Sequence, residues 1–76
     1  MTTEAYILLN IVLGKEKELL EQLKLLEETK ECWIVMGSFD IICHVLVDSA
    51  KELRPLVTNK IRALDGVRQS MTVIVV

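Results

Sequence analysis

The stretch Met36–Asp40, with the sequence Met-Gly-Ser-Phe-Asp, brings together groups that can hold a small polar ligand. The Asp40 carboxylate can accept hydrogen bonds from an ammonium group, while the Ser38 hydroxyl and the backbone amides beside Gly37 can donate to a carboxylate. Phe39 places a large apolar ring on a turn, where it can shield a ligand or contact a neighbouring subunit. The same residues also fit the tip of a packed hairpin that binds nothing, and the motif alone leaves both interpretations open.

Two runs of β-forming residues flank this stretch, at 32–35 and 41–47, and they predict two strands joined in a hairpin. Gly37 can take a positive φ at the tip. If Met36 lies opposite Asp40, the alternation of side chains divides the hairpin into two faces. One face then carries Trp33, Val35, Ile41, Cys43, Val45 and Val47, and the other carries Cys32, Ile34, Met36, Ile42, His44 and Leu46.

The residues before the hairpin predict a strand and a helix. Residues 5–13 are nearly all apolar, with Asn10 as the one polar member, and this favours a strand buried on both faces. Residues 15–28 are rich in Lys, Glu, Gln and Leu and predict an amphipathic helix. Its apolar stripe consists of Leu19, Leu20, Leu23 and Leu26, whereas Leu25 falls on a different side.

The residues after the hairpin predict a second helix and a last strand. Ser49 and Glu52 have the spacing of a capping box, and Gly66 is typical of a helix end. Pro55 lacks a backbone N–H, so the first turns should be kinked or the regular helix should start later. The terminal run 67–76 predicts a strand with Ser70 and Thr72 on one face.

The resulting order, β-α-β-β-α-β, predicts an α+β protein of ferredoxin-like fold, with an antiparallel sheet and both helices on one side. A chain of 76 residues makes one domain, 1–76, with a small core, yet 51% of its residues are hydrophobic. The second hairpin face is mostly apolar with one histidine. Both features favour a dimer in which two sheets pack face to face.

Charge and hydropathy exclude several classes of protein. Nine basic and eleven acidic residues give a net charge of −2, and the basic residues lie among acids, which argues against direct nucleic-acid binding. The chain has no apolar run of about 18 residues that would span a membrane, and its start does not resemble a signal peptide. We therefore expect a cytoplasmic protein with reduced, buried cysteines.

The order of elements and several short motifs resemble the ligand-binding domain of the Lrp/AsnC (feast/famine) regulators, the RAM domain. The resemblance covers essentially the whole chain, and the order and spacing of the motifs are more specific than any one of them. The matching segments are Ala5-Tyr6-Ile7-Leu8-Leu9, Gly14-Lys15-Glu16, Met36-Gly37-Ser38-Phe39-Asp40, Gly66-Val67 and Thr72-Val73-Ile74-Val75.

This resemblance implies a mode of assembly and a ligand. Members of the family usually carry a helix-turn-helix DNA-binding domain before this one, and here Met1 stands directly before the first strand, which implies a stand-alone form. The family forms sheet-to-sheet dimers, commonly four in a ring, with a free amino acid bound between neighbouring dimers. Carried over to this sequence, the ligand contacts fall on Gly37, Phe39, Asp40, Ser70 and Thr72, although the family often has threonine where Ser70 stands.

The sequence therefore predicts a non-enzymatic amino-acid-sensing and oligomerisation module that acts in transcriptional regulation without a metal or cofactor. Its expected partners are further copies of itself, a free amino acid and full-length regulators of its own type. The identity of the amino acid and the number of dimers stay open. The expected dimer interface consists of Tyr6, Leu8, Ile34, Ile42 and His44.

Three other functions compete with this one. A small dimeric α+β barrel enzyme would need a titratable group between sheet and helices, whereas His44 is predicted on the opposite face. A metal site is disfavoured because Cys32 and His44 share a face while Cys43 points the other way, and the chain has no Cys-x-x-Cys motif. A structural interaction module that binds no ligand stays open.

Overall fold

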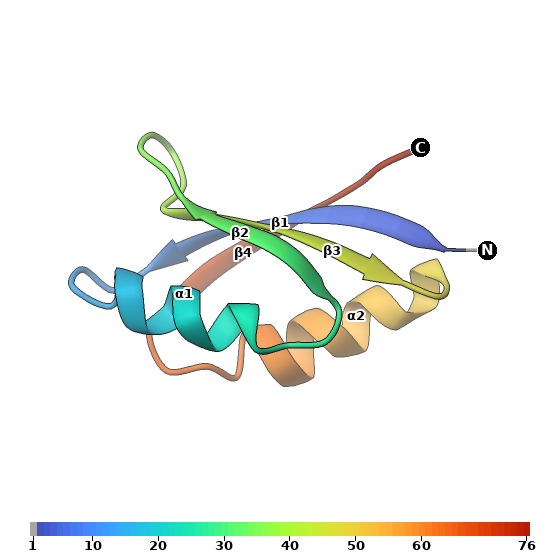
Figure 1. The fold of residues 1–76 in the computed structure, drawn as a ribbon. Helices are drawn as coiled ribbons and strands as arrows, with labels where there is room; N and C mark the ends of the chain where they lie inside the picture. Colours follow the sequence, from blue (N-terminus) through green and yellow to red (C-terminus); the bar gives the residue numbers. More distant parts are fainter. Residues whose placement is uncertain (1) are drawn as a thin grey trace.

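The computed structural model describes residues 2–76 as one antiparallel sheet with its helices packed on one side (Figure 1). The strands lie in the order β2-β3-β1-β4. This arrangement confirms the predicted ferredoxin-like α+β fold. The elements are β1 (Thr3–Ile11), α1 (Glu16–Lys24), β2 (Thr29–Ile34), β3 (Ile41–Val47), a second helical region made of η1 (Ala50–Glu52), α2 (Leu53–Pro55) and η2 (Leu56–Ile61), and β4 (Val67–Ile74).

The central strand β1 pairs with β3 on one side and with β4 on the other. Its inward side chains are buried under the helices, whereas Tyr6 and Leu8 on the opposite face are only partly covered. The expectation that this strand is buried on both faces is therefore wrong for a single chain, because the helices cover one face only. The buried members are Ala5, Ile7, Leu9 and Ile11.

Helix α1 packs its predicted stripe onto the sheet. Leu19 and Leu23 are fully buried, and Leu25 is 84% exposed, as its position off the stripe predicts. The helix ends at Lys24, four residues before the predicted end. In the residues that follow, the N–H of Leu25 donates to the Gln22 carbonyl at 3.2 Å, three residues back, which tightens the last turn before the chain enters β2.

The second helical region is irregular around Pro55, as predicted. Its start is capped, since the Ser49 N–H donates to the Glu52 carboxylate at 2.9 Å. The region begins as a 3-10 turn, continues as a short α-helical segment and widens after Pro55 into a π-helix, in which the Arg62 N–H donates to the Val57 carbonyl at 2.7 Å. Because Pro55 cannot donate a backbone hydrogen bond, a regular helix does not extend through this point.

The register of the hairpin differs from the prediction by one residue. Cys32 lies opposite Cys43, Trp33 opposite Ile42, and the Val35 N–H donates to the Asp40 carbonyl at 2.8 Å. A slip of one residue moves every side chain of a strand to the other face. The predicted faces of β3 are correct, whereas those of β2 are inverted: Cys32 is buried beside Cys43, and Trp33 and Val35 border the face turned away from the helices, here called the outer face.

Candidate ligand-binding site

The turn between β2 and β3 rises from the end of the hairpin on the side of the sheet away from the helices (Figure 1). Gly37 has a φ of 140°, which lies in the region that favours glycine, and it allows the chain to reverse there. The turn is anchored where β3 begins, because the Asp40 N–H donates to the Leu9 carbonyl of β1 at 2.8 Å. Asn10 adds a second anchor by donating from its side-chain amide to the Ser38 carbonyl at 2.8 Å.

The side chain of Asp40 is also tied to β1. Its Oδ2 atom accepts the backbone N–H of Ile11 at 2.9 Å, at the point where the β1–β4 register shifts between Asn10 and Ile11. A carboxylate offers about four acceptor positions on its two oxygens. Asp40 therefore holds the local backbone and keeps acceptor capacity for a ligand.

Two hollows lie beside the turn and share Asn10, Ser38 and Gln69 in their walls. Their volumes are about 400 and 580 Å³, and both are open to the surface. The turn, the end of β1 and the start of β4 thus border two adjoining hollows, here together called the recess. The first hollow adds Phe39, Arg62, Ser70 and Met71, and the second adds Ile11, Asp40 and Arg68.

The recess carries charges of both signs. Asp40 and Arg68 border the same hollow from neighbouring parts of the sheet, and Arg62 reaches the other hollow from the end of the second helical region. Within residues 2–76, the recorded ion pairs involve neither arginine. A guanidinium binds a carboxylate through two parallel hydrogen bonds, and a carboxylate binds an ammonium group. The recess therefore offers groups for both ends of a zwitterion.

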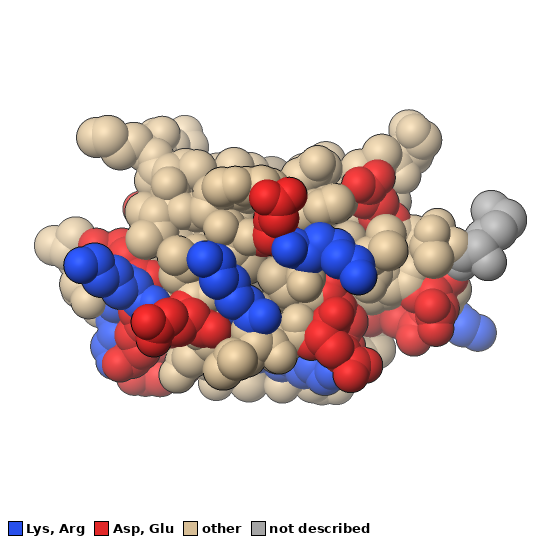
Figure 2. Space-filling view, in the orientation of Figure 1, with Lys and Arg blue, Asp and Glu red and all other residues tan. Residues whose placement is uncertain are grey.

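The outer face of the sheet forms a separate, apolar surface. A hollow of about 640 Å³ is lined by four of the predicted interface residues together with Trp33, Val35 and Val73. Figure 2 shows charged side chains gathered mainly over the helices and few of them toward the outer face. The four interface residues are Tyr6, Leu8, Ile34 and Ile42.

The fifth predicted interface residue, His44, lies next to this hollow. Its ring stacks on Tyr6 with the centroids 4.9 Å apart, and its Nε2 atom lies 2.5 Å from the Glu4 carboxylate. Ile34 belongs to the edge strand and is 47% exposed, although its register partner Ile41 is buried on the helix side. The inverted register places Ile34 on the helix side with Ile41, so it borders the hollow only from the sheet edge, whereas Tyr6, Leu8, Ile42 and His44 share the outer face.

The Lrp/AsnC ligand binding domain family matches residues 4–76 of the chain. The chain belongs to this family. A hypothetical protein of Pyrococcus horikoshii, PHS023, is 36% identical to this Lrp/AsnC domain, with a TM-score of 0.90 over 100% of this chain and 90% of its own. An uncharacterised HTH-type transcriptional regulator of Pyrococcus furiosus, PF0250, is 34% identical over 59 residues, which are 78% of this chain.

Longer proteins contain the same fold as one part. This Lrp/AsnC domain spans 39% of the length of the Pyrococcus furiosus regulator. The transcriptional regulator NMB0573 of Neisseria meningitidis, solved as a complex with L-Met, is 16% identical, with a TM-score of 0.88 over 97% of this chain and 49% of its own. At that identity the similarity concerns the fold.

The predicted ligand residues of the domain divide into two groups. Phe39 and Ser70 line the first hollow and Asp40 lines the second, whereas Gly37 and Thr72 line neither. Ser70 pairs with Leu9 and Thr72 with Ile7, so the two hydroxyls share a face of β4 as predicted. Thr72 lies two residues, or about 7 Å, farther along the strand from the turn.

Sequence reasoning missed four polar residues of the recess: Asn10, Arg62, Arg68 and Gln69. A signal for Asn10 existed, because it is the one polar residue in an otherwise apolar strand. Arg68 and Gln69 are two consecutive polar residues near the start of the last strand. Such a pair also indicates a position outside the core. Arg62 belongs to a helical surface, and its place at the recess depends on the tertiary fold.

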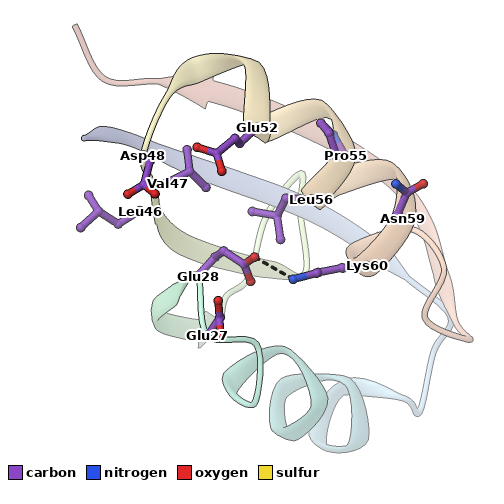
Figure 3. A pocket seen from close by; sticks show the side chains of 10 residues that line it. All are labelled: Glu27, Glu28, Leu46, Val47, Asp48, Glu52, Pro55, Leu56, Asn59 and Lys60. Carbon is purple, nitrogen blue, oxygen red and sulfur yellow. Dashed lines mark hydrogen bonds and ion pairs between the residues drawn. The ribbon is translucent and has the colours of Figure 1, made fainter. Parts of the chain in front are cut away.

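A fourth hollow, of about 480 Å³, lies between the residues that precede β2, the end of β3 and the second helical region (Figure 3). In it, Lys60 Nζ donates to Glu28 Oε2 at 2.7 Å. This hydrogen bond lowers the pKa of Glu28 and raises the pKa of Lys60. The pair thereby links η2 to the residue preceding β2.

The structure corrects the predicted environment of Cys32. The cysteine does not share a face with His44, because the register places it beside Cys43 in the core. Within residues 2–76, no three His, Cys, Asp or Glu side chains cluster in a way that could hold a metal ion. In the same part of the chain, no helix has the length and apolar character needed to cross a membrane.

Proposed function

We propose that this domain is a non-enzymatic amino-acid-sensing and oligomerisation module of a transcriptional regulatory system. The observation that carries the proposal is that Asp40 and Arg68 line one open hollow, with charges suited to the two ends of an amino acid. The fold shared with a regulator solved as a complex with L-Met supports the same ligand class. The similarity to a regulator of the helix-turn-helix type supports the regulatory context.

Each side chain has a definite role in this proposal. The Asp40 oxygen that is not engaged by Ile11 accepts from the ligand ammonium group, and the Arg68 guanidinium donates to the ligand carboxylate. Ser70 supplies a further hydroxyl donor, and Phe39 covers the ligand side chain. The size of the space beside Phe39 then selects among amino acids.

The site is completed by assembly. Gly37 and Thr72 line neither hollow within one chain. In this proposal they contact a ligand that is bound in the recess of a neighbouring dimer. An open recess at a subunit contact becomes closed when the second surface arrives, which excludes water and strengthens the charged contacts. Ligand binding and association of dimers are thereby coupled free energies.

The dimer itself forms through the outer face. Trp33 and Val73 are 40% and 47% exposed there and lie beside the apolar side chains of Tyr6, Leu8 and Ile42. A continuous apolar face of this kind is costly in water and typical of a surface that self-associates. The two-fold symmetric packing of two such sheets leaves the recess at the turn free for contacts between dimers.

Calorimetric titration against the twenty amino acids tests the proposal, after a thermal-shift screen has selected candidates. A ligand present at a hundred times its dissociation constant stabilises the folded state by about 2.7 kcal/mol. We expect one or a few amino acids to raise the melting temperature and to release or absorb heat on titration. If none of the twenty does either, the domain does not sense a free amino acid.

A second candidate function is that of a structural adaptor which joins full-length regulators of its own family. The apolar outer face favours it, because that surface can pair with the same surface of a related chain whether or not a ligand binds. Mixing the domain with a full-length relative and separating the products by size distinguishes the two. Mixed particles without any amino-acid effect would support the adaptor function.

A further inference from the structure

Cys32 and Cys43 lie side by side in the core between β2 and β3. They are direct register partners, are 6% and 0% exposed, and their Sγ atoms are 2.7 Å apart. Both are free thiols. Neither residue belongs to the recess at the turn or to the apolar hollow of the outer face.

The backbone around the pair suits a disulfide. Directly opposed residues of antiparallel strands have Cα atoms about 4.5–5.5 Å apart. Disulfides join residues whose Cα atoms are about 4.4–6.8 Å apart. A bond between Cys32 and Cys43 therefore requires side-chain rotation and no change in strand pairing.

The two thiols differ in access and in charge environment. Cys32 borders a surface hollow of about 510 Å³ whose wall includes Lys24 and Lys30, whereas Cys43 lies beneath the sheet surface. A hydrogen bond from the Cys43 thiol, together with the positive charge of Lys24, lowers the pKa of Cys32 against the opposing effect of burial. The same hydrogen bond and burial raise the pKa of Cys43. Cys32 is thus the thiol that ionises first and lies nearer to solvent.

We propose that Cys32 and Cys43 form a peroxide-responsive pair, in which Cys32 is the reacting thiol and Cys43 resolves it to an intramolecular disulfide. The Cys32 thiolate attacks one oxygen of hydrogen peroxide, the O–O bond breaks, and the departing hydroxide takes up a proton to become water. Cys32 becomes a sulfenic acid. The Cys43 sulfur then attacks the Cys32 sulfur, the S–O bond breaks, and a second water leaves with the thiol proton. Two thiols are oxidised by two electrons, and one peroxide is reduced to two waters.

The bond links the edge strand to the rest of the sheet. β2 has one strand neighbour, β3, and the pair sits in the same hairpin that carries the turn at 36–40. An edge strand opens more readily than a central one, because fewer hydrogen bonds hold it. The disulfide restricts that opening, so oxidation slows amide hydrogen exchange in β2 and raises the melting temperature.

Mass spectrometry of the full chain treated with dilute hydrogen peroxide tests the proposal. In the folded wild type we expect the loss of two hydrogen atoms, a peptide joining Cys32 to Cys43 after proteolysis, and recovery of both thiols with a reductant. The Cys43→Ala variant should stop at a sulfenic acid on Cys32 that is trapped by a cyclic 1,3-dione. The Cys32→Ala variant should leave Cys43 unmodified at the same peroxide dose.

Three outcomes would overturn the proposal: both thiols persisting in the folded wild type, Cys43 reacting as fast in Cys32→Ala as Cys32 does in Cys43→Ala, or disulfides forming only between chains. Circular dichroism before and after treatment establishes that the folded protein reacts. The wild-type measurement needs no substitution, so it stands even where a core variant fails to fold. None of these results depends on whether the domain binds an amino acid.

Discussion

Asp40 and Ile11 are joined by a hydrogen bond of 2.9 Å between the carboxylate of the hairpin turn and a backbone N–H of the central strand. The bond forms at the register shift in β1, where the ladder with β4 is interrupted. It gives Asp40 a structural role in addition to the proposed contact with a ligand. Substitutions of Asp40 therefore have to separate a lost backbone acceptor from a lost negative charge.

Asp40→Asn separates the two roles, because asparagine keeps an oxygen for the Ile11 N–H and removes the charge. Loss of a charge-assisted hydrogen bond to the ligand ammonium should weaken amino-acid binding by about 1.5–3 kcal/mol, or roughly ten- to a hundredfold. The melting temperature of the ligand-free protein should hardly change. Calorimetric titration and thermal unfolding of both proteins measure the two effects.

The matched control is Asp48→Asn, which removes the same charge beyond the opposite end of β3. It should leave affinity unchanged. Asp40→Ala should in addition destabilise the free protein by about 1–3 kcal/mol, since it leaves the Ile11 N–H without its partner. Equal affinity of wild type and Asp40→Asn would remove Asp40 from the ligand site and leave it as a cap of the turn.

Arg68 is the second charged group of the recess, and its substitution tests the opposite end of the ligand. Arg68→Gln should weaken binding roughly tenfold or more, because the ligand carboxylate loses a charged donor. The affinity of Arg68→Lys should lie between those of wild type and Arg68→Gln, because lysine keeps the positive charge but lacks the planar guanidinium group. Titration calorimetry at fixed ionic strength measures the series.

Arg54→Gln is the control for this series, since Arg54 is an exposed arginine of α2 that lines neither hollow of the recess. A loss of affinity in Arg54→Gln equal to that in Arg68→Gln would point to the overall charge of the domain. The contact at Arg68 would then be rejected.

The fold could be predicted because the order of elements and the inward positions follow from simple periodicities. Leu19 and Leu23 lie on a helical stripe, and β3 alternates so regularly that both of its faces were assigned correctly. The register of β2 could not be predicted in the same way. Cys32, Trp33 and Ile34 are consecutive apolar residues, so alternation gives no preference between their two possible orientations.

The candidate site could be predicted only in part for a different reason. The turn is local, and its residues Phe39 and Asp40 stand out by type and spacing. Asn10, Arg62 and Arg68 come from three other segments, and they meet at the recess through strand pairing and helix packing. No local sequence pattern therefore predicts that these three residues lie together.

The outer face yields a prediction about assembly. Ile42→Glu places a carboxylate in the apolar hollow, where each chain of a symmetric dimer would bury it. Because burial of an isoleucine side chain is worth about 1.5–3 kcal/mol, the dimer dissociation constant should rise at least roughly tenfold. Sedimentation velocity over a range of concentrations measures the shift from dimer to monomer.

Leu25→Glu is the matched control for that substitution, because Leu25 is 84% exposed at the end of α1, on the helix side of the sheet. It should leave the sheet-to-sheet dimer intact. A wild-type protein that stays monomeric at micromolar concentration would contradict the proposed dimer. An equal loss of dimer in both variants would place the interface elsewhere.

The ion pair between Glu28 and Lys60 yields a prediction about pH. Hydrogen bonding to Lys60 lowers the pKa of Glu28 in the folded protein from its ordinary value of 4.5. A carboxyl with a lowered folded pKa stabilises the fold above its unfolded pKa, and this contribution is lost as the pH falls through the folded pKa. Glu28→Gln should therefore melt below wild type at neutral pH, and the difference should shrink steadily as the pH is lowered from 4.5.

Thermal unfolding from neutral to acidic pH measures this difference, with Glu27→Gln as the control. Glu27 lines the same hollow, but the recorded hydrogen bond from Lys60 goes to Glu28, so its removal should change stability less at neutral pH. If the melting temperatures of Glu28→Gln and wild type differed by the same amount at all pH values, the ion pair would contribute no stability that depends on protonation of Glu28. The link between η2 and the residues before β2 would then depend on apolar packing, since Leu56 belongs to the core and Leu26 packs against that core.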